Sequence, residues 1–94
     1  MAQLLWLPEA QQDIALLHEF LHEKSPAAAQ KMVHTLLQGA DQLLTFPEMG
    51  KPMEDELQRR ELFIPFGAGA YVLRYKLTGD QAVIIRVLHS RENR

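Results

Sequence analysis

Apolar residues recur at helical spacing through the first half of the chain. The first set falls at intervals of four, three and four residues, which places its members on one helical face: Ala10, Ile14, Leu17 and Leu21. Pro8 suits the first turn of such a helix, and Glu9 puts a negative charge near the positive end of its dipole. The pattern predicts a helix from Pro8 to about Lys24, preceded by a short apolar strand over residues 3–7.

A second helix start follows at once, with Ser25 as N-cap and Pro26 at the first helical position. The same spacing continues through Ala29, Val33, Leu36, Ala40 and Leu43, and the helix is predicted to end near Phe46-Pro47. Because the break between the two helices is so short, they are expected to form an antiparallel hairpin. Gly39 costs this helix about 1 kcal/mol relative to Ala, so it either permits a close approach of another element or is neutral.

The last third of the chain changes to a period of two residues. Alternating apolar positions predict strands over residues 61–66, 71–77 and 83–89, separated by Gly67-Ala68-Gly69 and Thr78-Gly79-Asp80. Pro65 places the end of the first of these strands at an edge or a bulge. Strict alternation in the third strand puts Val83, Ile85, Val87 and His89 on one face, and Ile84, Arg86 and Leu88 on the other.

Residues 47–59 interrupt both patterns with two prolines, a glycine and four acidic residues. The segment is predicted to be a loop, and its length indicates either a functional role or a simple crossover from helices to sheet. The resulting order, β-α-α-β-β-β, predicts a single α+β domain over residues 1–94. Its N-terminal strand and antiparallel helical hairpin precede a three-stranded antiparallel sheet.

The amino-acid composition narrows the possible classes of protein. The chain has no cysteine, so disulfides and cysteine zinc sites are excluded, and no apolar run is long enough for a signal peptide or membrane span. The net charge of −2 hides an asymmetry: residues 1–56 carry −6, whereas residues 57–94 carry +4, with six arginines among seven cations. A basic half favours an acidic partner. Alternatively, the two halves neutralise each other within the fold.

His18-Glu19-Phe20-Leu21-His22 matches the H-E-x-x-H pattern of zinc proteases on a predicted helix. Catalytic zinc normally takes three protein ligands, and nothing marks His34 or His89 as the third. A half-exposed structural pair is therefore the favoured interpretation, and no metal site is predicted.

Basic residues recur in and just after the last two predicted strands, at Arg74, Arg86, His89 and Arg91. If these strands are antiparallel neighbours, Arg74 and Arg86 lie nearly opposite each other. The cluster could bind phosphates or an acidic peptide, or activate a ribose 2′-hydroxyl with the histidine as acid or base. The alternative is a solvated face with salt bridges to Glu61 and the helices.

Short matches in a fixed order along the chain resemble the ParE/RelE superfamily of bacterial toxin–antitoxin toxins. They comprise Trp6 with Pro8-Glu9-Ala10 and Asp13-Ile14, Ser25-Pro26 with Ala28-Ala29, Leu43-Leu44 before Phe46-Pro47 and Gly50, Arg60-Glu61-Leu62, Tyr71 to Tyr75, and Ile84 to Arg91. The resemblance implies a cytoplasmic toxin that a cognate antitoxin holds inactive with an acidic segment, and it implies no cofactor. The expected antitoxin-binding or target-binding residues are Arg60, Arg74, Arg86, His89 and Arg91.

Two activities divide the superfamily: ParE-like members poison DNA gyrase, and RelE-like members cut mRNA on the ribosome. Val72, Phe63 and Pro65 stand where RelE-like nucleases usually have cations, and no Tyr follows Tyr75. A ParE-like, non-enzymatic toxin is therefore favoured. The alternatives are a RelE-like endoribonuclease, with His89, Arg86, Arg74 and Arg91 as its catalytic residues, and a non-toxic protein-binding module.

Overall fold

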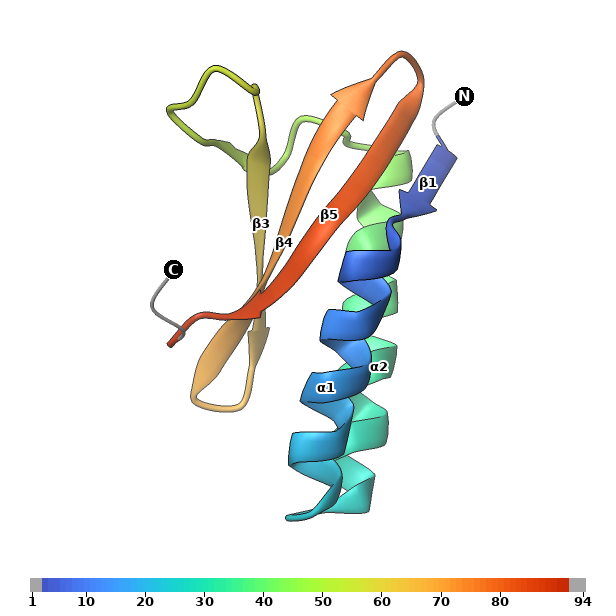
Figure 1. The fold of residues 1–94 in the computed structure, drawn as a ribbon, viewed down its shortest axis with the longest axis vertical. Coiled ribbons are helices and arrows are strands. Elements are labelled where there is room, and N and C mark those ends of the chain that lie inside the picture. Colours follow the sequence, from blue (N-terminus) through green and yellow to red (C-terminus); the bar gives the residue numbers. More distant parts are fainter. Residues whose placement is uncertain (1–2, 92–94) are drawn as a thin grey trace.

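The computed structural model describes residues 3–91 as one sheet with two helices packed against it (Figure 1). The elements in chain order are β1 (Gln3–Trp6), α1 (Pro8–His22), α2 (Pro26–Asp41), the 3-10 turn η1 (Gln42–Leu44), β2 (Lys51–Pro52), β3 (Arg60–Phe66), β4 (Gly69–Thr78) and β5 (Gln81–His89). The predicted α+β class and the helical hairpin are confirmed.

The sheet has five strands in the order β1-β5-β4-β3-β2. The three predicted C-terminal strands are antiparallel neighbours at its centre, as predicted, and β1 and β2 raise the number of strands from three to five. β1 joins in parallel beside β5, and β2 pairs antiparallel with the start of β3. The first pairing joins opposite ends of the chain, and the second strand has only two residues. Neither feature leaves a periodic signal in the sequence.

Local sequence signals account well for the ends of the elements. The Ser25 hydroxyl accepts a hydrogen bond from the backbone N–H of Ala28 at 3.1 Å, as an N-cap should. The β3–β4 and β4–β5 hairpins each have a two-residue connection that begins with a glycine at positive φ, Gly67 at 60° and Gly79 at 61°. Glycine adopts this backbone conformation without a steric penalty, which explains both turns.

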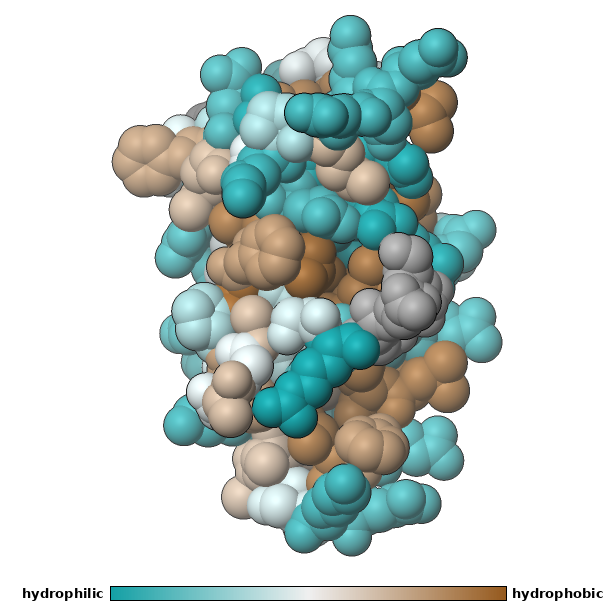
Figure 2. Space-filling model, turned by 90° about the vertical axis from the view of Figure 1, so that its left-hand side faces the viewer, coloured by the Kyte–Doolittle hydropathy of each residue, from teal (hydrophilic) through white to brown (hydrophobic). Residues whose placement is uncertain are grey.

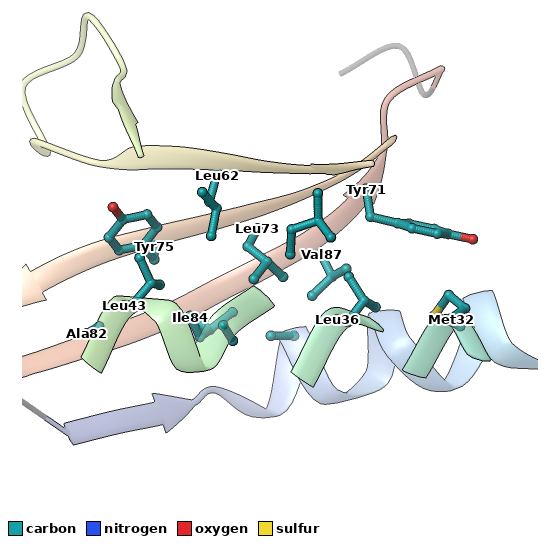
Figure 3. Packing of buried hydrophobic residues seen from close by; sticks show 13 residues of the cluster. Met32, Leu36, Leu43, Leu62, Tyr71, Leu73, Tyr75, Ala82, Ile84 and Val87 are labelled. Carbon is teal, nitrogen blue, oxygen red and sulfur yellow. The ribbon is translucent and has the colours of Figure 1, made fainter. Parts of the chain in front are cut away.

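The core lies between the helical hairpin and one face of the sheet (Figure 3). Its fully buried large side chains are Met32, Leu36, Leu43, Leu73, Tyr75, Ile84 and Val87. Gly39 serves close packing, because a Cβ atom there would lie 2.9 Å from Cγ1 of Ile64 on β3. None of the helices within residues 3–91 is long and apolar enough to span a membrane.

A bulge in β5 overturns the predicted alternation of its side chains. Arg74 pairs with Arg86, but the next pair is Tyr75 with Ile84, which leaves Ile85 without a partner on β4. The extra residue shifts the register, so Ile84 and Val87 both reach the core although three positions separate them. The assignment of Ile84 to the face opposite Val87 is therefore wrong.

Candidate functional site

A groove of about 500 Å³ opens between the C-terminal half of α1 and the end of the sheet where β4 begins and β5 ends. β1 pairs only with residues 81–84, so the rest of β5 has no strand neighbour on that side and approaches α1 instead. The chain passes directly from β1 into α1, which places the helix along this uncovered part of β5. The groove is lined by Leu17, Phe20, Leu21, Lys24, Tyr71, His89 and Arg91.

A buried carboxylate fastens α1 to β5 beside the groove. Asp13 accepts hydrogen bonds from Nε of Arg86 at 2.7 Å and Nη2 at 3.1 Å. It also accepts from the backbone N–H of Val87 at 2.9 Å, beyond the last residue that β1 covers. Asp13 thus supplies the hydrogen-bond acceptor that a neighbouring strand would provide, and a buried N–H without such a partner would be unfavourable. This contact sets the position of one groove wall against the other.

Aromatic packing orders the sheet side of the groove. The rings of Tyr71 and His89 meet edge to face with centroids 5.3 Å apart, and Phe66 packs on Tyr71 at 5.5 Å. The backbone N–H of Arg91 donates to Nδ1 of His89 at 3.1 Å, so a neutral imidazole carries its proton on Nε2. Burial raises the pKa of the Tyr71 hydroxyl, which therefore stays neutral at physiological pH.

Two cations stand at the rim of this apolar groove. Nζ of Lys24 lies 4.5 Å from the centroid of the Phe20 ring, and the Arg91 side chain is exposed. Neither cation forms an ion pair with another residue in the described range 3–91. The groove therefore combines apolar walls with positive charge at its edge.

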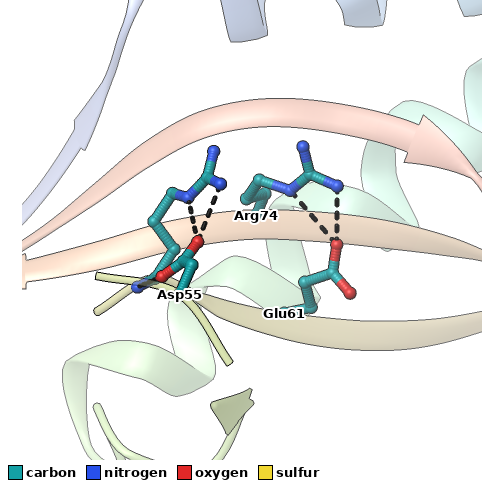
Figure 4. A network of polar contacts seen from close by, with 4 residues as sticks. Asp55, Glu61 and Arg74 are labelled. Carbon is teal, nitrogen blue, oxygen red and sulfur yellow. Dashed lines mark hydrogen bonds and ion pairs between the residues drawn. The ribbon is translucent and has the colours of Figure 1, made fainter. Parts of the chain in front are cut away.

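The predicted basic residues separate into two groups. His89 and Arg91 line the groove, whereas Arg60 lies farther along the sheet, opposite Tyr75. Arg74 and Arg86 are directly paired across the strands, as predicted. Their guanidinium groups bind different carboxylates: Arg74 meets Glu61 on β3 at 2.9 Å (Figure 4), and Arg86 meets Asp13.

Sequence reasoning did not name Lys24, Phe20 or Tyr71 as groove residues. A signal for the helical part was present. Leu16 and Phe20 lie one turn apart on α1, outside the stripe that the core uses, and each is 58% exposed. Two large apolar residues on a second helical face indicate a contact that the fold itself leaves open.

The H-E-x-x-H match lies on α1, with His18 half-buried and His22 exposed. Their rings are neighbours, with centroids 5.6 Å apart and planes tilted by 31°. Among residues 3–91, no group of three or more His, Cys, Asp or Glu side chains is placed to hold a metal ion.

Comparison with known proteins identifies the family to which this fold belongs. Residues 4–94 match the model of the ParE toxin of the type II toxin–antitoxin system parDE. The toxins RelE3 and RelE1 of Caulobacter vibrioides are 36% and 35% identical to the chain. The first alignment covers 93% of this chain and 92% of the relative, and the second covers 90% and 89%.

A solved structure described as a chromosomal ParDE system from P. aeruginosa superposes with a TM-score of 0.78. It covers 95% of this chain and 96% of that one at 20% identity, which establishes a shared fold. The chain belongs to the ParE toxin family, and the superfamily resemblance seen in the sequence is confirmed. It is the toxin component of a type II toxin–antitoxin system, a class that pairs with a cognate antitoxin.

Proposed function

We propose that this toxin acts on DNA gyrase in the cytoplasm and is neutralised by an antitoxin whose acidic, amphipathic segment occupies the groove. The observation that carries the antitoxin site is the combination of apolar walls with Lys24 and Arg91 at the rim. An amphipathic segment would cover Phe20 with its apolar side, and its carboxylates would meet the two cations.

The state of the arginines supports a gyrase poison over a nuclease. A nuclease needs cations directed at the phosphate and a group that moves a proton. Arg74 and Arg86 are each bound by a carboxylate of the protein, which leaves them less able to hold a phosphate. The other two residues of the alternative catalytic set, His89 and Arg91, line the groove. His89 beside Arg91 and Tyr71 is the arrangement that keeps an endoribonuclease as the second candidate.

Supercoiling by purified gyrase tests the target. Added toxin is expected to inhibit the reaction and to trap a cleaved DNA complex, and the antitoxin encoded beside the toxin gene should restore activity. An uninhibited enzyme with no trapped complex would remove gyrase as the target.

Ribosome toeprinting then tests the second candidate, which requires mRNA cleavage that His89→Ala abolishes. A protein that leaves growth unaffected on induction would instead be a non-toxic binding module.

Charge reversal at the rim tests the groove. Lys24→Glu and Arg91→Glu should each weaken antitoxin binding by about tenfold or more, because each turns an attraction into a repulsion. Lys31→Glu is the matched control, since Lys31 is an exposed cation on α2 that does not line the groove. Equal affinities for all three variants would place the antitoxin elsewhere.

A further inference from the structure

Residues 46–59, called the acidic loop below, leave the helical hairpin at the end of the molecule away from the groove. A fully buried side chain holds the first part of this loop from inside. The Tyr75 hydroxyl donates to the carbonyl of Pro47 at 2.8 Å and accepts from the backbone N–H of Gly50 at 2.9 Å. Figure 3 shows the hydroxyls of Tyr75 and Tyr71 at opposite ends of the core, one toward the loop and one toward the groove.

Two arginines also hold the loop, one at its first part and one farther along. Arg60 donates through Nη1 to the carbonyls of Glu48 at 3.0 Å and Gly50 at 2.8 Å. Arg59 forms an ion pair with Asp55 at 2.7 Å, drawn in Figure 4. The backbone N–H of Met53 also donates to the carbonyl of Arg59 at 2.8 Å. These bonds fix the conformation of the loop before any partner arrives, which lowers the entropic cost of binding.

The outer surface of this braced loop carries large apolar side chains and more acidic than basic groups, with Lys51 as its exposed cation. Phe46 is 63% exposed, Leu57 is 55% exposed and Met49 is 43% exposed. The exposed acids Glu48, Glu54 and Glu56 lie among them, and none forms an ion pair with another residue of the described range. Large apolar side chains held in water by an ordered scaffold do not stabilise the fold, and they are typical of a contact surface.

The acidic loop and the groove are separate in space. In Figure 1 the loop stands at the upper left, whereas the groove-forming ends of α1, β4 and β5 lie in the lower half. In Figure 2 the upper end is mostly hydrophilic with single hydrophobic side chains projecting from it, and hydrophobic residues gather again in the lower half. The charges differ as well, because the groove is basic at its rim and the loop is acidic.

We propose that the acidic loop is the surface that docks on the cellular target, a protein with an apolar pocket flanked by cations. The inference rests on the proposed toxin function and adds that the target and the antitoxin are met by different ends of the molecule. Leu57 and Phe46 supply the apolar anchors, and Glu54 and Glu56 supply charge complementarity. The opposite charge of the groove favours this division, since one basic partner would not suit both surfaces.

The test separates the two surfaces with paired variants in the full-length toxin. Leu57→Ser and the double variant Glu54→Lys/Glu56→Lys change the loop. Leu37→Ser and Glu19→Lys are the matched controls, because both residues are exposed on helices outside the loop. Circular dichroism confirms that each variant folds. The readouts are growth arrest on induction, inhibition of purified gyrase, and affinity for the antitoxin encoded beside the toxin gene.

The loop variants should relieve growth arrest and raise the inhibitory concentration for gyrase by about tenfold or more, while the Kd for antitoxin stays within about twofold. Growth arrest equal to that of the parent and the controls would overturn the proposal. An equal loss of antitoxin affinity would also overturn it, because the loop would then belong to the antitoxin surface. If the parent arrests growth without inhibiting gyrase, gyrase fails as the target and growth arrest alone decides on the loop.

Discussion

The groove and the acidic loop use their charged residues in opposite ways. At the groove, Lys24 and Arg91 form no ion pair with other residues in the described range, and the walls are apolar. At the loop, Arg59 and Arg60 bind loop atoms, and the exposed acids Glu48, Glu54 and Glu56 outnumber the exposed Lys51. Among the cations of residues 57–94, Arg91 is therefore exposed beside the groove, whereas Arg59 and Arg60 bind atoms of the loop. The +4 charge of residues 57–94 overstates what a partner can reach.

How deeply each cationic side chain is buried explains why some cations are paired with carboxylates and others face water. Arg74 and Arg86 lie in the sheet and are only 19% and 34% exposed, and Glu61 and Asp13 each pair with one of them. Arg91 follows the last strand and is exposed, so water satisfies it. Position within the fold, more than residue type, decides which cations remain available.

The largest effect is expected at the groove wall. Asp13→Ala leaves the Arg86 guanidinium and the Val87 N–H without their carboxylate, and we expect the free energy of unfolding to fall by about 3 kcal/mol. Urea denaturation measures this change. Asp41→Ala, which removes an exposed carboxylate from the end of α2, should stay within about 0.5 kcal/mol of the parent. Equal effects would mean that Asp13 does not hold α1 to β5.

Gly50→Ala is the corresponding change at the loop. A Cβ atom at this position would lie 2.6 Å from the Tyr75 ring and 3.0 Å from the carbonyl oxygen of Glu61, so the loop must move. We expect a loss of about 2 kcal/mol in thermal or urea unfolding. Gly67→Ala is a contrasting variant, because open space surrounds that site and its cost comes from the positive φ of 60°. A stable, unchanged Gly50→Ala protein would show that the loop is not braced as described.

Tyr75→Phe removes the hydroxyl and keeps the buried ring. The carbonyl of Pro47 and the N–H of Gly50 each lose a partner, so we expect a loss of about 1 kcal/mol. Amide hydrogen exchange at Gly50 should accelerate while exchange in β4 and β5 stays slow. Unchanged protection at Gly50 would contradict the assigned role of the hydroxyl.

The smallest effect concerns alkaline pH. Burial raises the pKa of Tyr71 and Tyr75 in the folded protein, although the Gly50 N–H bond acts against burial at Tyr75. Below about pH 10 both tyrosines are neutral in either state, and their stabilising contribution is complete. Above it, the unfolded chain ionises first, so stability should decline as pH rises toward the folded pKa values. Tyr71→Phe should lessen this decline, and an identical pH profile would argue against the shift.

Helix ends, tight turns and helix faces could be predicted from the sequence, because residues close together in the chain determine them. The Ser25 cap and the Gly67 and Gly79 turns follow from neighbouring residues alone, and the helix faces follow from spacing. The bulge at Ile85 was not predictable, because it depends on how β5 meets both β4 and α1. The Asp13–Arg86 bond joins residues 73 positions apart, and no periodic pattern reports such a contact.

The candidate site follows the same division. His89 and Arg91 were predicted from their place at the end of the last strand, and the structure brings them to the groove. Lys24 and Phe20 come from the other end of the chain and join them only through the packing of α1 beside β5. The exposed Phe20 on α1 was a visible signal, but only the fold shows that it lines the groove.

Calorimetric titration of the cognate antitoxin into two charge-reversal variants tests the division of surfaces most directly. Arg91→Glu changes the groove, and Glu54→Lys/Glu56→Lys changes the acidic loop. We predict that the Kd rises by about tenfold or more for Arg91→Glu and stays within about twofold of the parent for the loop variant. Unchanged binding by Arg91→Glu together with weakened binding by the loop variant would contradict it.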